Sequence, residues 1–315
     1  MAEFSIYLFW TGFATAGMAT VLYIAYVASA SVSLHRVSAQ TEMGTITLSG
    51  TTGQPNPSLG YLATTFTAFT VLFLGGQVAT RWAATGHAPI SDLYEFTAAF
   101  AFGISAAYLA FETLGGLRRI GVLAMPIVCM MLFIATLFPT TITPLIPALQ
   151  NGPLLTIHVS TMMISYAILT VAFCGAVVYL VQGGEGHRRF ASLPSADAAG
   201  DLANKAVIIG FPLLGLGIAL GAWWANSAWG RYWGWDPKET SALVTWLSMA
   251  AYFHARAGTG SVAGAPGIRK IVPERIRRGW RPDPMWWLIV MWGLVMFTYF
   301  AVNLWVSGLH SYAGV

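Results

Sequence analysis

The sequence predicts an all-α, polytopic integral membrane protein: a bundle of about eight transmembrane helices that forms a single domain over residues 1–315. Of the 315 residues, 56% are hydrophobic and only 9% are charged, whereas about 25% of the residues in a soluble domain are charged. Several apolar runs also approach the roughly 20 residues that a helix needs to cross a bilayer. Helices are expected because backbone groups in lipid must be hydrogen-bonded within their own segment.

Eight apolar runs are the candidate spans. The first run has no basic region before it and no small-residue cleavage site, so we interpret it as a retained helix and not as a signal peptide. Two polar connections are expected on the inner side, a Ser/Thr/Gly-rich one at 31–59 and another at 182–204. The predicted spans are residues 4–30, 61–78, 93–111, 120–138, 154–181, 206–224, 241–257 and 286–306.

The positions of the positive charges predict the orientation. With both termini outside, 13 of the 16 Lys and Arg residues fall in inner loops, and only Arg81, Arg231 and Lys238 fall on the outer side. A Trp-rich loop at about 225–240 is then periplasmic, and a basic loop at about 258–284 is cytoplasmic. We interpret the basic loop as an orientation signal that touches anionic lipid. The net charge of +4 therefore gives no reason to expect a nucleic-acid partner.

Neither the cysteines nor the glycine-rich rows predict a chemical site. Cys129 and Cys174 each lie inside an apolar run without a CxxC or CxxH pattern. This spacing argues against a disulfide framework, a zinc site or a thiol-redox centre. Small residues such as Gly210, Gly215 and Gly217 are typical of close packing between membrane helices.

The Trp-rich segment is the most informative part of the chain. Five of the thirteen Trp residues lie between positions 223 and 235, a density typical of an interfacial belt or of a binding shelf. The run Asp236-Pro237-Lys238-Glu239 also predicts a helix start, with Asp at the N-cap, Pro at the first position and Glu at the third. Asp236 is therefore expected to cap the seventh helix. A rigid cap is compatible with a binding shelf beside it.

Two histidines are predicted at the outer side, at the two ends of the region that contains the Trp-rich segment. His158 opens the fifth predicted helix and His310 follows the eighth. Imidazole nitrogens are common axial ligands of haem iron, and Trp faces can stack on a porphyrin. Arg231 and Lys238 could pair with haem propionates. Each histidine taken alone is also compatible with an ordinary surface position.

His254 lies about 13 residues into the seventh predicted helix, roughly 20 Å from its outer start. An ionisable residue at this depth predicts a functional partner, although a neutral histidine bonded to a nearby carbonyl is the alternative. A second imidazole would come from His35 or from a partner protein. His87 precedes Ser91 or Asp92, either of which could cap the third helix, and it falls on the outer side near the Trp-rich segment. Ordering this loop is its expected role, and binding the cofactor is the alternative.

These residues carry a resemblance to a known family. Residues 229–240 closely resemble the tryptophan-rich WWD motif of haem-handling proteins. The Pro-Lys-Glu-Thr ending resembles the CcsA (ResC) branch, a membrane subunit of the System II cytochrome c synthase, more than the CcmC or CcmF proteins. Segments 86–95, 149–159 and 308–312 resemble other CcsA segments in the expected order, and the resemblance spans roughly residues 60 to 315.

The resemblance implies a function in cytochrome c biogenesis. In this family haem b is presented outside the membrane and joined through its vinyl groups to the thiols of a CxxCH motif on apocytochrome c. The chain would thus be a cytochrome c haem lyase (holocytochrome c synthase) subunit in the bacterial inner membrane, with its site facing the periplasm, and a thylakoid membrane is the less favoured alternative. It would act mainly by positioning haem. The alternative is a haem exporter or relay without ligase activity.

The resemblance also implies roles for single residues. His254 would match the transmembrane histidine, whose mate lies on a CcsB (ResB) partner. Two departures from the family pattern stand out: Asp92 replaces an expected Asn, and residues 151–154 lack a frequent aromatic residue. The implied outer axial pair is His158 and His310, and the implied core of the haem shelf is Trp229, Trp233, Trp235 and Asp236.

Overall fold

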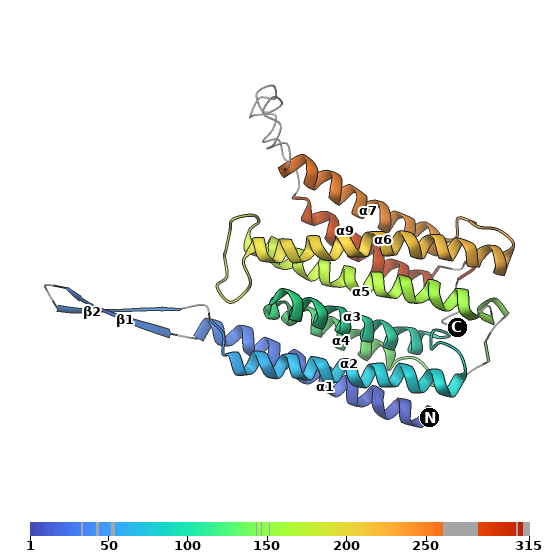
Figure 1. Ribbon diagram of the computed structural model, residues 1–315, viewed down its shortest axis with the longest axis horizontal. Helices are drawn as coiled ribbons and strands as arrows, with labels where there is room; N and C mark the ends of the chain where they lie inside the picture. The colour runs from blue at the N-terminus through green and yellow to red at the C-terminus, as the bar shows by residue number, and fades with distance from the viewer. Residues whose placement is uncertain are drawn as a thin grey trace, which may run out of the picture.

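The computed structural model describes residues 1–32, 34–41, 44–51, 54–142, 144–145, 147–150, 152–260, 283–306 and 308–310. Long helices lie side by side along one axis (Figure 1). They are α1 (Ala2–Val32), α2 (Pro57–Thr85), α3 (Leu93–Gly115), α4 (Gly121–Ala135), α5 (Gly152–Gln182), α6 (Ala196–Trp229), α7 (Pro237–Gly260) and α9 (Met285–Met296). The short turns are η1 (Arg118–Ile120), η2 (Pro147–Gln150), the π-helical η5 (Phe297–Ala301) and α10 (Val302–Leu304).

This architecture confirms the predicted helical membrane bundle. All eight predicted spans coincide with helices, and within the described residues six helices are long and apolar enough to cross a membrane. The helix at Met285–Ala301 is also apolar, but it is too short to be counted among these six. Because α7 is more polar, it is not among the six. Eight spans therefore remain a prediction, whereas a multi-pass membrane protein is established.

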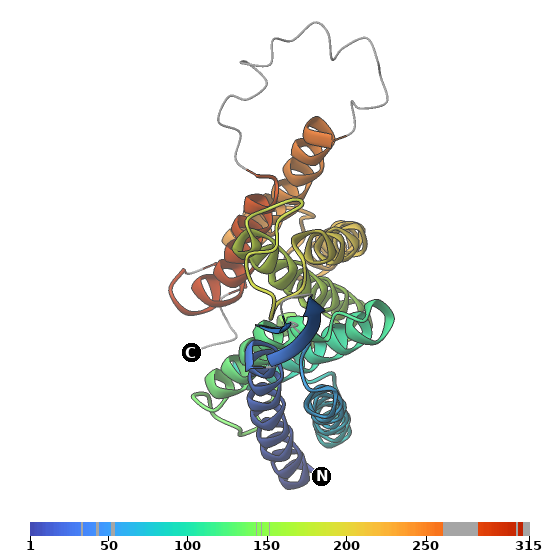
Figure 2. The same ribbon diagram turned by 90° about the vertical axis from the view of Figure 1, so that its left-hand side faces the viewer.

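The helices pack as successive pairs: α1 with α2, α3 with α4, α5 with α6, and α7 with α9 (Figure 2). The contacts α1–α4, α2–α3, α3–α5 and α5–α9 join these pairs. The predicted close packing at glycines is present on α6. A Cβ at Gly210 would lie 2.7 Å from the Leu169 side chain, and one at Gly217 would lie 2.5 Å from the sulfur of Met162. These glycines let α5 and α6 approach closely.

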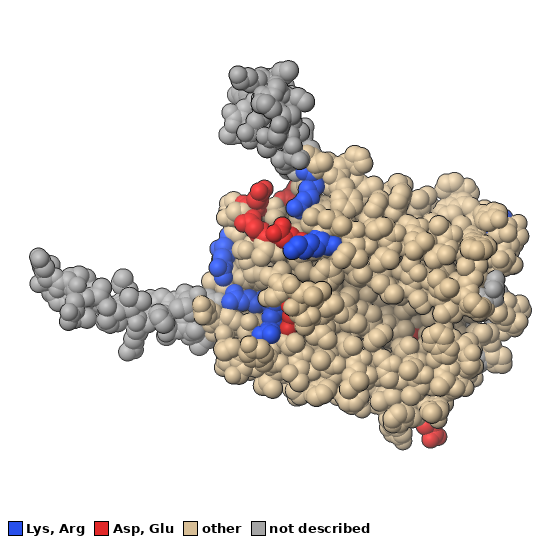
Figure 3. Space-filling view, in the orientation of Figure 1, with Lys and Arg blue, Asp and Glu red and all other residues tan. Residues whose placement is uncertain are grey.

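The two ends of the bundle differ in charge. Most of the visible Lys and Arg residues lie at one end, together with most of the visible acidic residues (Figure 3). We call this the hairpin end, because β1 (Leu34–Thr41) and β2 (Gly44–Thr51) extend from it (Figure 1). At the opposite end, which we call the site end, α1, α3, α5 and α7 begin. The orientation across the membrane remains a prediction, which this separation of charge supports.

The connection at 31–59 contains structure that the sequence did not predict. β1 and β2 form a two-stranded antiparallel hairpin in which His35 is paired with Gly50. The segment is rich in Thr and Ser and contains Val37 and Ile46, and β-branched residues favour extended backbone. The hairpin leaves the bundle (Figure 1). The side chain of His35 lies outside the described part of the structure, so the alternative that His35 supplies the second imidazole for His254 stays a prediction.

Helix α6 is longer than predicted at both ends. It begins at Ala196, where Ser195 caps it by accepting a hydrogen bond from the Ala198 N–H, so that part of the expected polar loop is helical. It ends at Trp229, because Gly230 adopts a left-handed conformation (φ 73°) and closes the helix. The predicted Trp-rich loop at about 225–240 is thus reduced to residues 230–236. Of the predicted basic loop, residues 261–282 lie outside the described residues.

At the hairpin end, a buried carboxylate joins three helices and a turn. Glu112 of α3 accepts hydrogen bonds from the hydroxyls of Tyr23, Thr64 and Tyr108, and the guanidinium Nε of Arg118 lies 3.1 Å from its Oε1. The Tyr108 hydroxyl is 2.6 Å from Oε2. A buried charge is costly unless it is paired and hydrogen-bonded. This cluster therefore fixes α1, α2, α3 and η1 against one another.

Candidate functional site

A cavity that is open to the surroundings lies at the site end between α3, α5, α6, α7 and the segment that follows α10. Its wall is mostly apolar and aromatic. A few polar side chains face it, which is the usual composition of a ligand pocket. The lining residues on which the argument depends are His158, Trp224, Trp233, Lys238, Glu239 and His310.

His158 reaches the cavity from the first turns of α5. Its Nδ1 lies 2.8 Å from the carbonyl oxygen of Gly217 on α6. Because a carbonyl oxygen only accepts, Nδ1 carries the proton and Nε2 keeps its lone pair, which is the state required of a metal ligand. A Cβ at Gly221 would lie 2.5 Å from Cε1 of His158. The imidazole therefore occupies space that only glycine leaves.

His310 reaches the same cavity from the C-terminal segment. Its Nδ1 lies 2.7 Å from Oδ2 of Asp236, and the backbone N–H of Leu309 donates to Oδ1 at 2.6 Å. A Cβ at Gly308 would lie 2.6 Å from that same Oδ1. Donation to a carboxylate fixes the tautomer and leaves Nε2 as the lone-pair nitrogen.

Asp236 also caps α7, as the sequence predicted. Its Oδ2 accepts from the backbone N–H of Lys238 at 3.1 Å. Glu239 completes the reciprocal box: its Oε2 accepts from the backbone N–H of Asp236 at 3.1 Å and from that of Gly234 at 2.9 Å. The expectation that Asp236 serves mainly as a helix cap was incomplete, because the same carboxylate holds His310.

Burial and hydrogen bonds determine the charge states at this end. Burial alone would raise the pKa of Asp236, but the hydrogen bond from His310 and those from the backbone hold it below its ordinary value, so the carboxylate stays ionised. Burial lowers the pKa of His310 despite its hydrogen bond to Asp236. Burial also lowers the pKa of Lys238 to about 8. At neutral pH the site therefore combines a neutral imidazole, a carboxylate and a partly desolvated cation.

Trp224 is the central aromatic residue of the site and was not singled out from the sequence. It is 1% exposed, and its ring lies 6.3 Å from that of His158 (interplanar angle 12°) and 5.8 Å from that of His310. Its indole N–H has no hydrogen-bond partner among the described residues. One signal was available, because Trp224 follows Gly217 by seven positions and Gly221 by three, which places it on the α6 face that packs on α5.

The remaining members of the predicted shelf lie at different depths. The ring of Trp229 packs against that of His310, with a centroid distance of 4.8 Å and nearly perpendicular planes, and does not line the cavity. Trp233 lines the cavity itself. Trp235 has a left-handed backbone (φ 55°), is 70% exposed, and lies with its ring 5.7 Å from that of Trp233. Arg231 is exposed in the same loop and does not line the cavity.

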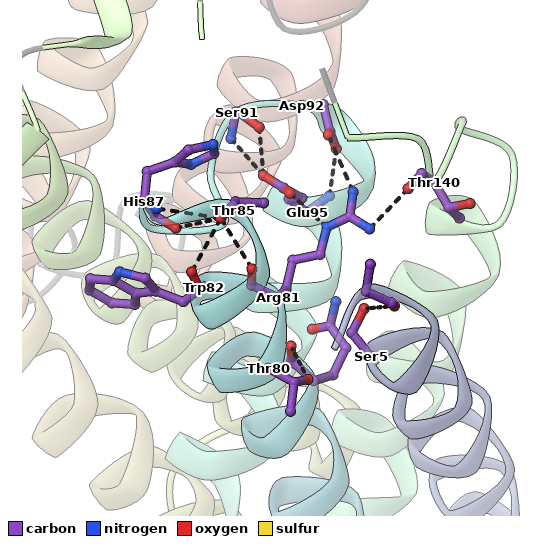
Figure 4. Close-up of polar contacts among 12 residues, drawn as sticks. Ser5, Thr80, Arg81, Trp82, Thr85, His87, Ser91, Asp92, Glu95 and Thr140 are labelled. Carbon is purple, nitrogen blue, oxygen red and sulfur yellow. Dashed lines mark hydrogen bonds and ion pairs between the residues drawn. The ribbon is translucent and has the colours of Figure 1, made fainter. Parts of the chain in front are cut away.

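His87 lines a second cavity of about 280 Å³. Three residues of its wall, Ile90, Leu149 and Leu155, also line the large cavity, so the two are neighbours. The Nδ1 of His87 lies 2.9 Å from the carbonyl oxygen of Ala88. The carbonyl of His87 accepts from the Thr85 hydroxyl, an arrangement that orders the loop (Figure 4).

A buried ion pair anchors this loop from below (Figure 4). Arg81 is fully buried and places its Nε 2.7 Å from Oε1 of Glu95, while its Nη1 donates to the carbonyl of Thr140 at 2.9 Å. The other oxygen of Glu95 accepts from the Ser91 hydroxyl at 2.6 Å. Asp92 caps α3 through the Glu95 N–H, as expected, and burial raises its pKa to about 6. The sequence had placed Arg81 in an outer loop.

His254 lies away from both cavities. It is exposed on α7, and its Nδ1 lies 2.8 Å from the carbonyl oxygen of Ala250, one turn earlier. This local hydrogen bond matches the alternative that the sequence left open. Within the part of the chain that the structure describes, this is the one hydrogen bond of the ring, and the side chain is exposed.

The donors of the large cavity fit haem. Two neutral imidazoles face one cavity, each with its Nδ1 held by an oxygen, and haem takes axial ligands of this kind. Aromatic rings form the wall, Trp224 contributes a buried N–H that has no hydrogen-bond partner in the described part of the chain, and Lys238 adds a partly desolvated cation to the lining. A flat apolar ligand with two carboxylates would match this set of groups.

The chain is similar in sequence to several known proteins. The family model described as "Cytochrome C assembly protein" matches residues 90–310. A protein named "Cytochrome c biogenesis protein CcsA" from Synechococcus elongatus is 34% identical over 292 residues, covering 76% of this chain and 84% of the relative. Proteins of the same name from Guillardia theta (34% identity; 81% and 85% covered) and from Synechocystis sp. (31%; 82% and 90%) are also similar.

Proposed function

Because this chain belongs to the cytochrome c assembly protein family, and so acts in cytochrome c maturation as a multi-pass membrane protein, we propose that it holds haem b between His158 and His310. In this proposal the haem is presented on the outer face of the bacterial inner membrane for covalent attachment to apocytochrome c. The observation that carries the proposal is that both imidazoles face one aromatic-walled cavity and that both Nδ1 atoms are held by oxygen acceptors.

In this proposal the chain promotes covalent attachment mainly by positioning the haem. In thioether formation the S–H of each substrate cysteine adds across a haem vinyl group: the carbon–sulfur bond forms at the inner vinyl carbon, and the proton ends on the terminal carbon. The substrate supplies both thiols, and Cys129 and Cys174 of this chain do not line the cavity. Holding the porphyrin so that its vinyl edge meets the thiols replaces a chance encounter with a directed one, and well-oriented groups gain several kcal/mol in this way, about 7–11 at the upper end.

Three groups of the wall have proposed roles in orienting haem. Lys238 lines the cavity, so its ammonium group could pair with a propionate of the bound haem, and burial strengthens such a pair. Trp233 offers a ring to the porphyrin edge. The buried N–H of Trp224 is a donor for a polar group of the bound haem. Arg231 is exposed in this structure, so a contact between Arg231 and a propionate would need the loop to move.

His254 is proposed to serve a second haem position deeper in the membrane. Its exposed position on α7 suits an iron ligand that shares the haem with a second ligand from another chain. A CcsB-type membrane protein is the proposed source of the second imidazole. Haem would then pass from this shared position to the outer cavity.

The visible spectrum of the purified chain tests the proposal. We expect the detergent-solubilised protein, expressed with its CcsB-type partner, to carry a Soret band that weakens in His158→Ala and in His310→Ala. His187→Ala is the matched control, because His187 is exposed in a loop at the hairpin end. A normal Soret band in both cavity variants would refute ligation by these histidines.

Co-expression with an apocytochrome separates ligation from relay. Covalent haem on the CxxCH segment supports the lyase function. Haem export without any covalent product, under conditions in which the partner is present, would support the alternative of a relay.

A further inference from the structure

The two cavity histidines are held by unlike acceptors. His310 donates to a carboxylate oxygen of Asp236 at 2.7 Å, whereas His158 donates to the main-chain carbonyl of Gly217 at 2.8 Å. A negatively charged acceptor draws the Nδ1 proton more strongly than a neutral carbonyl does, which leaves more electron density on Nε2. His310 is therefore the stronger donor toward a metal.

The segment that carries His310 is also held more firmly to its acceptor. One oxygen of Asp236 bonds to the imidazole while the other accepts from the backbone N–H of the preceding residue, Leu309. Asp236 is itself fixed as the cap of α7. The ring of His158, by contrast, makes a single hydrogen bond to the described residues, the one to Gly217. Losing an iron bond would thus disturb fewer contacts at His158 than at His310.

The second cavity lies on the His158 side of the site. Its wall includes Gly152, Leu155 and Thr156 of α5, and Leu155 lies one turn before His158 and lines both cavities. A peptide that occupies the second cavity would therefore approach the iron position from the side of α5. Residues 308–310, the described part of the C-terminal segment, do not line this second cavity.

We infer that the two axial histidines have different fates: Asp236 makes His310 the retained iron ligand, and His158 is the ligand that the histidine of the incoming CxxCH segment replaces. Asp236 is thus a positioning residue that acts through His310. This inference rests on the proposed function, because it presupposes haem held between the two histidines.

Competition between two imidazole sources tests which ligand leaves. The probes are free imidazole and a synthetic Ser-Ala-Ala-Ser-His peptide, which carries the substrate histidine but no thiol. In haem-loaded His158→Gly, imidazole fills the position that the peptide needs. A tenfold increase in imidazole, above its own dissociation constant, should then weaken peptide binding about tenfold, as mass action requires. In His310→Gly, imidazole fills the opposite position, and peptide binding should not weaken.

The readout is the axial-ligand region of the visible or resonance Raman spectrum. The reverse pattern, or competition in both variants, would overturn the inference. If neither variant nor the wild-type chain carries haem, the proposed function itself fails, so the two failures are distinguishable.

The reduction potential tests the role of Asp236 directly. Asp236→Asn removes the charge but keeps a good N-cap, so α7 should still form. The negative carboxylate favours ferric over ferrous haem, so its loss should lower the equilibrium ratio of ferric to ferrous haem about tenfold. This change corresponds to a rise in reduction potential of about 59 mV for one electron. Glu239→Gln, which removes a nearby charge without touching His310, is the control and should shift the potential less. An unchanged potential in Asp236→Asn, or an equal shift in the control, would overturn the role of Asp236.

Discussion

Gly221 of α6 lies directly against the imidazole of His158 on α5, and a Cβ added at this glycine would be 2.5 Å from Cε1. Gly221→Ala should therefore push the ring out of its position without changing any chemical group of the site. Overpacking of this kind typically costs about 1–3 kcal/mol, so haem occupancy should fall roughly tenfold. The measurement is the ratio of Soret absorbance to protein after purification with a fixed haem supply.

The control for this variant is Gly293→Ala on α9, where a Cβ would meet nothing within 4 Å. Equal haem loss in both variants would point to a general helix effect and would contradict the steric explanation.

Lys238 predicts a pH dependence of haem binding. Its pKa is lowered by burial to about 8, so the free protein loses this cation as the pH rises through that value. If the cation pairs with a propionate, binding raises this pKa again, and affinity should fall above pH 8 by up to about tenfold per pH unit. Haem titrations between pH 7 and 9.5 measure the effect. Lys238→Arg should abolish the pH step, and Lys238→Met should bind weakly at every pH; a step that persists in Lys238→Met would assign it to another group.

The Arg81–Glu95 pair predicts a stability effect at a distance from the cavity. Both side chains are buried, and their charged atoms are 2.7 Å apart, whereas the other carboxylate near this guanidinium, that of Asp92, is 4.0 Å away. Glu95→Gln therefore removes the nearer counter-ion of a buried guanidinium. Breaking such a pair typically costs about 3–5 kcal/mol. We expect a lower midpoint of thermal unfolding in detergent and faster proteolysis within residues 86–92. Arg188→Met, a change to an exposed arginine, is the control and should leave both measurements unchanged.

The position of His254 leads us to expect that a substitution there affects the membrane haem position and leaves the outer one intact. Because its side chain is exposed on α7 and does not line the cavity, His254→Ala should not change the spectrum of haem supplied directly to the outer site. The same variant should lose haem that is acquired only in the presence of the CcsB-type partner. Loss of outer-site binding in the absence of the partner would contradict this separation.

The patterns that the sequence predicted well are local or compositional. The apolar runs placed all the long helices, since length and hydropathy decide whether a segment can cross a bilayer. The sequence Asp236-Pro237-Lys238-Glu239 predicted a capping box, because the box depends on residues three positions apart. The helix ends were less accurate, as at α6, where alanines extend the helix into the expected loops.

The relationships that the sequence could not predict join distant segments. Nothing in the chain order indicates that Asp236 bonds to His310, 74 residues away, or that Arg81 is paired inside the bundle instead of lying in a loop. Trp224 was one of five tryptophans: its spacing from the glycines of α6 indicates the helix face that packs on α5, but only the fold shows its contact with both histidines. Such contacts depend on how the helix pairs assemble, which no spacing rule encodes.

The bond between Asp236 and His310 has a consequence for biosynthesis. A ribosome delivers the chain from its N-terminus, so His158, Trp224 and Asp236 enter the membrane before His310 exists. The first four helices can pack while the cavity still lacks one of its two imidazoles and the carboxylate lacks its partner. A nascent or truncated chain therefore cannot close the site, and under the proposed function it would accept haem only after the last described segment has folded back onto the start of α7.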